Sequence, residues 1–116
     1  MTAPTLGPYS PVVRAGDFLY VSGQLGLDEN GHMVDGLEAQ TRLLIKNLET
    51  LLIENGAGLD KIVKTTVLLA DMAEFPMMNE IYAELFGDSK PARSTYAVKA
   101  LPKAALIEIE AVAYVG

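Results

Sequence analysis

Apolar side chains recur along this chain with helical spacing in two segments. In the first segment, residues 37–55, leucines lie on one face of a predicted helix, at Leu37, Leu44, Leu48, Leu51 and Leu52. Gly56 follows as a favourable left-handed C-cap, so we predict a helix over Leu37–Asn55. A shorter segment predicts a second helix that ends before Gly87. Its apolar positions are Phe75, Met78, Ile81, Tyr82 and Leu85.

Stretches rich in β-branched and aromatic residues predict the strands. Residues 12–14 and 18–25 flank a turn that contains glycine, and this arrangement predicts a first β-hairpin. Residues 62–69 are apolar on both faces, so we expect an interior strand there. Residues 91–98 and 106–113 are joined by a short link, and we expect them to pair as a last hairpin.

The resulting order is ββ-α-β-α-ββ, which predicts an α+β fold with both helices on one face of a mixed sheet. No linker is long enough to separate domains, so we expect a single domain over residues 1–116. The uncovered face of the sheet would carry much apolar surface, which makes it a candidate interface.

Composition strengthens the expectation of an assembly and narrows the function. Half of the residues are hydrophobic and the mean hydropathy is +0.23, so other subunits are expected to cover part of the apolar surface. No apolar run is long enough for a membrane span. The net charge of −6 disfavours nucleic-acid binding. Residues 1–5 lack the features of a secretory signal, so we expect a cytoplasmic protein.

The scarcity of cysteine and histidine excludes several kinds of site. The chain has no cysteine, which excludes disulfides, thiolate nucleophiles and zinc-thiolate sites. Its one histidine, His32, follows Asn30-Gly31 and is expected at an exposed turn tip, so a Ser/His nucleophile is disfavoured. One histidine and dispersed acids disfavour a metal site. No glycine-rich loop links a strand to a helix, so nucleotide binding is also disfavoured.

The best candidate for chemistry is an arginine beside a glutamate in the expected last hairpin. Side chains alternate along strands, so Arg93 and Thr95 would share a face with Glu108 and Glu110. A guanidinium binds a carboxylate bidentately, and a carboxylate in an apolar pocket can transfer protons. The pair would suit a small 2-oxo or 2-imino acid. The alternative is a structural ion pair, and these residue types do not decide between the two glutamates.

Three further residues have both a functional and a plain interpretation. The Tyr9 hydroxyl could reach into a pocket, although packing at the surface explains it equally. Asn79 lies next to the apolar stripe of the second helix, and a solvated or locally bonded amide is its alternative role. Gly23 interrupts a strand, which indicates a bulge or a close approach to the backbone.

Several short blocks, in one order from Gly7 to Val115, resemble the RidA (YjgF) family of enamine and imine deaminases. The blocks are Gly7-Pro8-Tyr9-Ser10, Val21-Ser22-Gly23-Gln24, Ile62-Val63-Lys64-Thr65-Thr66-Val67, Asn79 followed by Tyr82, Pro91-Ala92-Arg93-Ser94, Leu101-Pro102-Lys103 and Ile107-Glu108-Ile109-Glu110-Ala111-Val112-Ala113.

The resemblance implies a fold like that of the small trimeric chorismate mutases and a homotrimer with sites between subunits. It implies the substrates 2-aminoacrylate and 2-aminocrotonate with their imine tautomers, hydrolysed to 2-oxo acids and ammonia without a cofactor or metal.

By position, the resemblance implies that Arg93 binds the substrate carboxylate and that Glu108 positions or activates the water. It implies a structural role for Glu110. It places the other pocket residues at Tyr9, Ser22, Gly23, Asn79 and Thr95. Thr95 lies where many members of the family have cysteine. If backbone groups carry the role of this position, threonine should be tolerated; if a thiol is required for some activity, this protein should lack that activity.

Two other functions remain as alternatives. One is a non-catalytic protein that binds a small carboxylate through the same Arg93 and reports it to a partner. The other is a ribonuclease or translation inhibitor, which the acidic balance disfavours.

Overall fold

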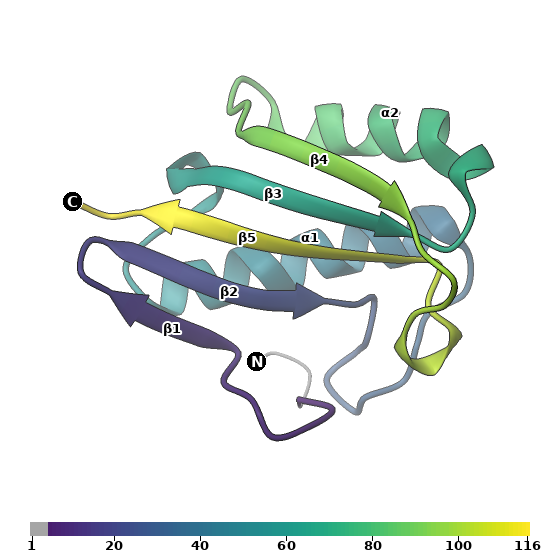
Figure 1. The fold of residues 1–116 in the computed structure, drawn as a ribbon, viewed down its shortest axis with the longest axis horizontal. Coiled ribbons are helices and arrows are strands. Elements are labelled where there is room, and N and C mark those ends of the chain that lie inside the picture. Colours follow the sequence, from purple (N-terminus) through teal and green to yellow (C-terminus); the bar gives the residue numbers. More distant parts are fainter. Residues whose placement is uncertain (1–4) are drawn as a thin grey trace.

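Two α-helices cover one face of a five-stranded mixed sheet in the computed structural model, which describes residues 5–116 (Figure 1). The predicted order ββ-α-β-α-ββ and the α+β class are confirmed. The expectation of no secretory signal draws on residues 1–4, which lie outside the described residues. The elements are β1 (Val12–Ala15), β2 (Phe18–Gln24), α1 (Leu37–Glu54), β3 (Ile62–Leu69), α2 (Phe75–Phe86), β4 (Ala92–Ala97) and β5 (Ile107–Tyr114).

The strands lie in the order β1-β2-β5-β3-β4. β1 and β2 form the predicted hairpin, and β3 is an interior strand as expected. The predicted pairing of β4 with β5 is wrong, because β3 lies between them and pairs with β4 in parallel. The helix α2 connects β3 to β4, and a helical crossover of this kind joins parallel neighbours. The unit formed by β3, α2 and β4 therefore places β3 between β4 and β5.

The strand order decides which side chains share a face. Arg93 lies opposite Thr65, and Thr65 lies opposite Ala111, so all three project to the face covered by the helices, here the helix face. Glu108 precedes Ala111 by an odd number of positions and projects to the other face, the open face, as does Glu110. The predicted common face of Arg93 with the two glutamates is therefore wrong.

The core lies between the helix face and α1. The predicted leucine stripe is buried, with Leu44, Leu48 and Leu52 fully enclosed. These side chains belong to one apolar cluster with Val67, Leu69, Ile107 and Ile109 of the sheet. Burial of each such side chain contributes roughly 1.5–3 kcal/mol, so this cluster supplies most of the drive to form the two-layer arrangement.

Buried amides on α1 hold the loop that leads from β2 into the helix. Gln40 donates to the carbonyl of Val34 at 3.0 Å, and its own carbonyl accepts from the backbone N–H of Leu106 at 2.8 Å. Asn47 donates to the carbonyl of Leu27 at 2.9 Å. A buried amide with its partners in place fixes position, since leaving it unpaired would cost about 1–3 kcal/mol. The loop and the start of β5 are thereby fixed against α1.

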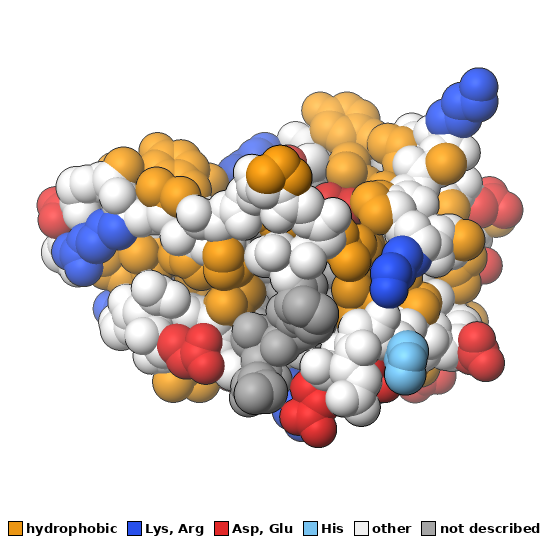
Figure 2. Space-filling model, turned by 90° about the horizontal axis from the view of Figure 1, so that it is seen from below, with side chains coloured by type: hydrophobic (Ala, Val, Ile, Leu, Met, Phe, Trp, Pro, Cys, Tyr) orange, Lys and Arg blue, Asp and Glu red, His pale blue; other side chains and the backbone are white. Residues whose placement is uncertain are grey.

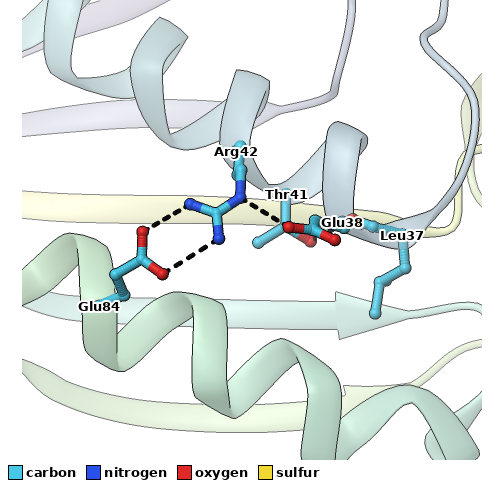
Figure 3. Close-up of polar contacts among 5 residues, drawn as sticks. All are labelled: Leu37, Glu38, Thr41, Arg42 and Glu84. Carbon is cyan, nitrogen blue, oxygen red and sulfur yellow. Dashed lines mark hydrogen bonds and ion pairs between the residues drawn. The ribbon is translucent and has the colours of Figure 1, made fainter.

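An exposed ion-pair cluster joins the two helices (Figure 3). Arg42 on α1 donates to both carboxylate oxygens of Glu84 on α2, at 2.7 and 3.1 Å, and to Glu38 one turn earlier at 3.1 Å. The hydrogen bonds from Arg42 lower the pKa of Glu84 below its ordinary value. This bidentate contact joins α1 to α2 at the surface, where an ion pair adds little to the stability that core packing supplies.

The open face carries aromatic and aliphatic side chains at the surface. Figure 2 views the molecule from below, not onto this face, and shows hydrophobic side chains among charged ones at the surface. The Phe18 ring packs against Tyr114 at 5.3 Å and against Tyr20 at 6.5 Å between centroids. The exposed apolar residues of this face are Val13, Phe18, Tyr20, Tyr96 and Tyr114. The expected apolar open face is thus present in the structure.

His32 occupies an exposed turn, with its side chain 79% accessible, as the sequence predicts. The Asp28 carboxylate shapes this turn by accepting from the backbone N–H groups of Asn30 and His32. In the part of the chain from residue 5 onward, neither helix has the length and apolar character needed to cross a bilayer.

We expect the Glu84→Gln variant to be less stable than the parent at pH 7, and the difference to vanish as the pH falls. The lowered pKa of Glu84 means that its contribution is present above the ordinary value of 4.5 and is lost as protonation breaks the Arg42 contact. Urea denaturation between pH 7 and pH 3 measures this, and added salt should shrink the difference because both groups are exposed. Glu80→Gln, on the same helix, is the matched control. An equal loss in both variants would contradict the role of the ion pair.

Candidate functional site

Arg93 lies in an open cleft of about 550 Å³ between α2 and the start of β4, here the arginine cleft. The arginine projects from the helix face at the outer strand of the sheet, so α2 forms the opposite wall. The predicted residue Asn79 is half-buried in the same cleft. The lining includes Asn79, Tyr82, Phe86, Pro91 and Arg93.

Aromatic rings hold the guanidinium of Arg93. Its central carbon lies 4.8 Å from the ring centroid of Tyr82 and 5.7 Å from that of Phe75. Within residues 5–116, the guanidinium makes no ion pair and no hydrogen bond. A half-buried guanidinium in this state has its planar fork of donors available for a carboxylate.

Glu108 lies in a second cleft of about 480 Å³, here the glutamate cleft, formed by β2, β5 and the segment before β1. The described residues therefore place Arg93 and Glu108 in separate clefts of one chain. The sequence-predicted residues in the glutamate cleft are Tyr9, Ser22, Gly23 and Glu108, and its other lining residues are Leu6, Leu25, Pro102 and Glu110.

A bulge in β2 shapes the glutamate cleft. The register of β2 against β5 shifts between Val21 and Gln24, as the glycine in this strand predicts. Ser22 lies in the shifted segment, and its hydroxyl donates to the carbonyl of Ser10 at 2.7 Å. This bond ties the segment that carries Tyr9 to β2.

Gly23 leaves the space that the Glu108 carboxylate occupies. A methyl group on Gly23 would overlap the carboxylate and would lie only 2.7 Å from its carboxyl carbon. The close approach predicted for Gly23 is therefore confirmed, and any other residue there would displace Glu108.

The carboxyl group of Glu108 holds its proton more tightly than an ordinary glutamate. Burial raises its pKa, and the negative charge of Glu110 raises it further. As the pH rises, Glu108 therefore ionises later than an exposed glutamate. A carboxylate shifted in this direction is a stronger base than that of an exposed glutamate, which suits it to accept and return a proton.

The remaining two residues that the sequence predicts for the pocket are Tyr9 and Thr95. Tyr9 is 47% exposed, and its hydroxyl accepts from the backbone N–H of Leu6 at 3.2 Å at the rim of the glutamate cleft. Thr95 shares the helix face with Arg93, and its hydroxyl oxygen is buried with no hydrogen-bond partner among the described residues. Thr95 thus supports the strand beside Arg93, and its hydroxyl does not open onto solvent.

A strained turn closes one side of the glutamate cleft. Lys103 and Ala104 both have φ of 55°, a left-handed conformation that costs a non-glycine residue roughly 1–2 kcal/mol. The Lys103 ammonium donates to the carbonyl of Gly31 at 2.8 Å and so helps to hold the turn. The turn places Pro102 in the wall beside Glu108.

Sequence reasoning missed the aromatic contacts of Arg93. Tyr82 appeared in the apolar stripe and in one of the short blocks quoted above, and Phe75 in the stripe, but neither was assigned a role beside Arg93. Helical spacing does not show which core ring lies beside a distant arginine. Within residues 5–116, no group of three or more His, Cys, Asp or Glu side chains is placed to hold a metal ion.

Residues 1–115 match the family model described as Endoribonuclease L-PSP. The chain is 48% identical over 111 residues to a RutC family protein of Pyrococcus abyssi, covering 94% of this chain and 87% of the relative. It is 45% identical over 113 residues to the 2-iminobutanoate/2-iminopropanoate deaminase of Mus musculus, covering 96% of this chain and 84% of the relative.

Solved structures share the fold over nearly the whole chain. The structure of RidA from the Antarctic bacterium Psychrobacter sp. PAMC 21119 has a TM-score of 0.95 and 34% identity, covering 97% of this chain and 93% of that one. The structure of E. coli TdcF with bound serine has a TM-score of 0.92 and 31% identity, covering 97% of this chain and 92% of that one.

We expect Glu110→Gln to lower the midpoint at which Glu108 titrates. Removing the neighbouring charge removes one cause of the raised pKa, while burial, the larger cause, keeps the midpoint above the ordinary 4.5. Carbon-detected NMR of the carboxyl groups between pH 3 and pH 8 measures the shift. Glu54→Gln, on α1, should leave the Glu108 midpoint unchanged. A midpoint that stays fixed in Glu110→Gln would show that the two carboxylates do not interact.

Proposed function

The chain belongs to the RidA (YjgF) family, and on that premise we propose that it hydrolyses reactive 2-imino acids to 2-oxo acids and ammonia. Relatives named 2-iminobutanoate/2-iminopropanoate deaminase, at about 45% identity, support an imine deaminase activity. The observation that carries the proposal is the Arg93 guanidinium, which lies beside aromatic rings in an open cleft and has no hydrogen-bond partner among residues 5–116.

In this proposal Arg93 binds the carboxylate of the imino acid. A planar guanidinium donates to both carboxylate oxygens at once, which fixes the plane of the substrate as well as its position. Asn79, Ser89 and Lys90 are polar residues that line the same cleft, and we propose that Asn79 contacts the remainder of the substrate. The E. coli TdcF structure with bound serine supports an amino-acid-like ligand for this fold.

Glu108 is proposed to handle the water. Its carboxylate accepts a proton as water adds to the imine carbon, and the protonated acid then returns the proton as the carbon–nitrogen bond breaks and ammonia leaves. An enamine substrate would first gain a proton at carbon to become the imine. Orientation of water and substrate is the main contribution needed, and no cofactor takes part in the proposed reaction.

The separation of Arg93 from Glu108 supports a site completed by a second copy of the chain. One copy would supply the arginine cleft and its neighbour the glutamate cleft with Tyr9, Ser22 and Gly23. The apolar open face supports such an assembly, because its exposed aromatic residues gain from burial. We propose a homotrimer with three shared sites, located in the cytosol.

We expect Arg93→Ala to lose at least about tenfold in activity, since a charge-assisted contact contributes about 1.5–3 kcal/mol. The assay follows 2-oxobutanoate formation from the enamine that a threonine dehydratase releases. Arg93→Lys keeps the positive charge but loses the planar fork of donors, so its activity should lie between those of the parent and Arg93→Ala. Arg14→Ala is the control, because the Arg14 side chain is exposed and donates to the backbone carbonyl of Gly16.

Each other outcome points to a different function. Parent-like rates in Arg93→Ala would refute the proposed role of the arginine. Tight binding of 2-oxobutanoate by the parent without any acceleration of hydrolysis would favour the non-catalytic carboxylate-binding protein. Salt-sensitive RNA binding with RNA cleavage would favour the ribonuclease alternative.

Mixed assemblies test whether each site draws on two copies. Arg93→Ala and Glu108→Gln should each be inactive alone, yet co-assembly in equal amounts should restore about a quarter of the parent activity, because random mixing leaves that share of interfaces intact. Sedimentation velocity on each single variant confirms that assembly is unchanged. A mixture that shows only the summed residual activities would place each complete site within one chain.

A further inference from the structure

We propose that Tyr82 is a positioning residue whose ring forms the platform that orients the Arg93 guanidinium for bidentate binding of a carboxylate. The inference rests on the proposed role of Arg93 as the carboxylate-binding residue. Tyr82 would act on the substrate only through Arg93 and would take no part in the chemical steps.

The contacts of Arg93 support this role. Two aromatic rings lie beside the guanidinium, with the centroid of Tyr82 at 4.8 Å and that of Phe75 at 5.7 Å from its central carbon. A cation over a ring face is attracted by the negative charge of that face, and the attraction grows when both groups are shielded from water. A contact with the face of the Tyr82 ring uses none of the N–H donors of the guanidinium, so they remain available for a carboxylate.

The sheet and α2 together fix the ring. The Tyr82 hydroxyl and the Thr65 hydroxyl lie 2.7 Å apart, and both residues are buried. Phe86, one turn later on α2, stacks on the Tyr82 ring at 4.3 Å with an angle of 22° between the planes. A buried hydroxyl pair and a stacked ring leave Tyr82 little freedom to rotate.

These contacts form a closed triangle. Thr65 lies directly opposite Arg93 in the pairing of β3 with β4. Tyr82 bonds Thr65 at one end of its ring and supports Arg93 on its face. The strand pairing, the hydroxyl bond and the cation–ring contact therefore place the guanidinium relative to the sheet without any ion pair that would occupy its donors.

Tyr82 has properties that suit support better than proton transfer. Burial raises the pKa of its hydroxyl, so the group stays neutral at physiological pH. The hydroxyl is also engaged with Thr65, away from the cleft. Removing the hydroxyl pair while keeping the ring should therefore preserve the function of Arg93.

Two matched double variants isolate the ring. Thr65→Val with Tyr82→Phe removes both hydroxyls and keeps the platform, whereas Thr65→Val with Tyr82→Leu removes the hydroxyls and the platform. Neither leaves a buried hydroxyl unpaired, so both are expected to fold. The probes are the Nε–H proton of Arg93 in NMR spectra, one of three such arginine signals in the chain, and the dissociation constant of 2-oxobutanoate.

We expect the Phe variant to keep the ring-current shift of the Arg93 Nε–H proton and to bind 2-oxobutanoate within twofold of the parent, roughly. The Leu variant should lose the shift and bind roughly tenfold more weakly. A merely structural role for Tyr82 would alter stability without separating the two variants in either readout. Equal binding by the Phe and Leu variants would overturn the proposal.

The Arg93→Ala protein separates failure of this inference from failure of the proposed function. If Arg93→Ala loses 2-oxobutanoate binding and the Leu variant does not, the platform is refuted and the role of Arg93 stands. If Arg93→Ala binds 2-oxobutanoate as the parent does, the proposed role of Arg93 fails instead. Should the Leu variant not fold, Tyr82→Met with Thr65→Val takes its place, and the same two outcomes decide.

Discussion

The parallel pairing of β3 with β4 is the constraint on which the candidate site depends. It inserts β3 between β4 and β5, and alternation along each strand then puts Arg93 on the helix face and Glu108 on the open face. No rotamer of either side chain brings them together through the sheet. Each group therefore occupies its own cleft, and any site that uses both must join two surfaces.

The helix α2 links this topology to the chemistry. As the crossover between β3 and β4 it enforces their parallel pairing, and its buried residues Met78 and Phe86 anchor it on the helix face. The same helix presents Asn79 and Tyr82 to the arginine cleft. Glu84, on its exposed side, is held by Arg42 of α1. Packing that the fold requires thus also determines where the guanidinium is supported.

Local patterns made the elements predictable, and the lack of long-range information limited the rest. Helical leucine spacing and glycine signals gave both helices and the first hairpin, because these features depend on neighbours in sequence. Alternation correctly grouped Arg93 with Thr95, and Glu108 with Glu110. The error lay in pairing the two strands with each other, since proximity in sequence favoured a hairpin and only the tertiary crossover excludes it.

The candidate residues show the same division. Gly23 was recognisable because a glycine inside a strand has few explanations, and the Glu108 carboxylate supplies one. The ring beneath Arg93 was not recognisable, because Tyr82 satisfies the helical apolar pattern as well as any core residue. A role that depends on two elements meeting leaves no local trace in the sequence.

Separation of the two charges has a chemical consequence. If Arg93 and Glu108 met within one chain, they would form an ion pair, which would lower the pKa of the glutamate and occupy the guanidinium fork. Apart, the arginine keeps its donors unpaired among residues 5–116, and the half-buried glutamate keeps a raised pKa. A carboxylate-bearing substrate placed between the two clefts would then satisfy the arginine itself, so that the glutamate stays available for water. The strand order that prevents β4 from pairing with β5 therefore also keeps Arg93 and Glu108 available for the proposed reaction.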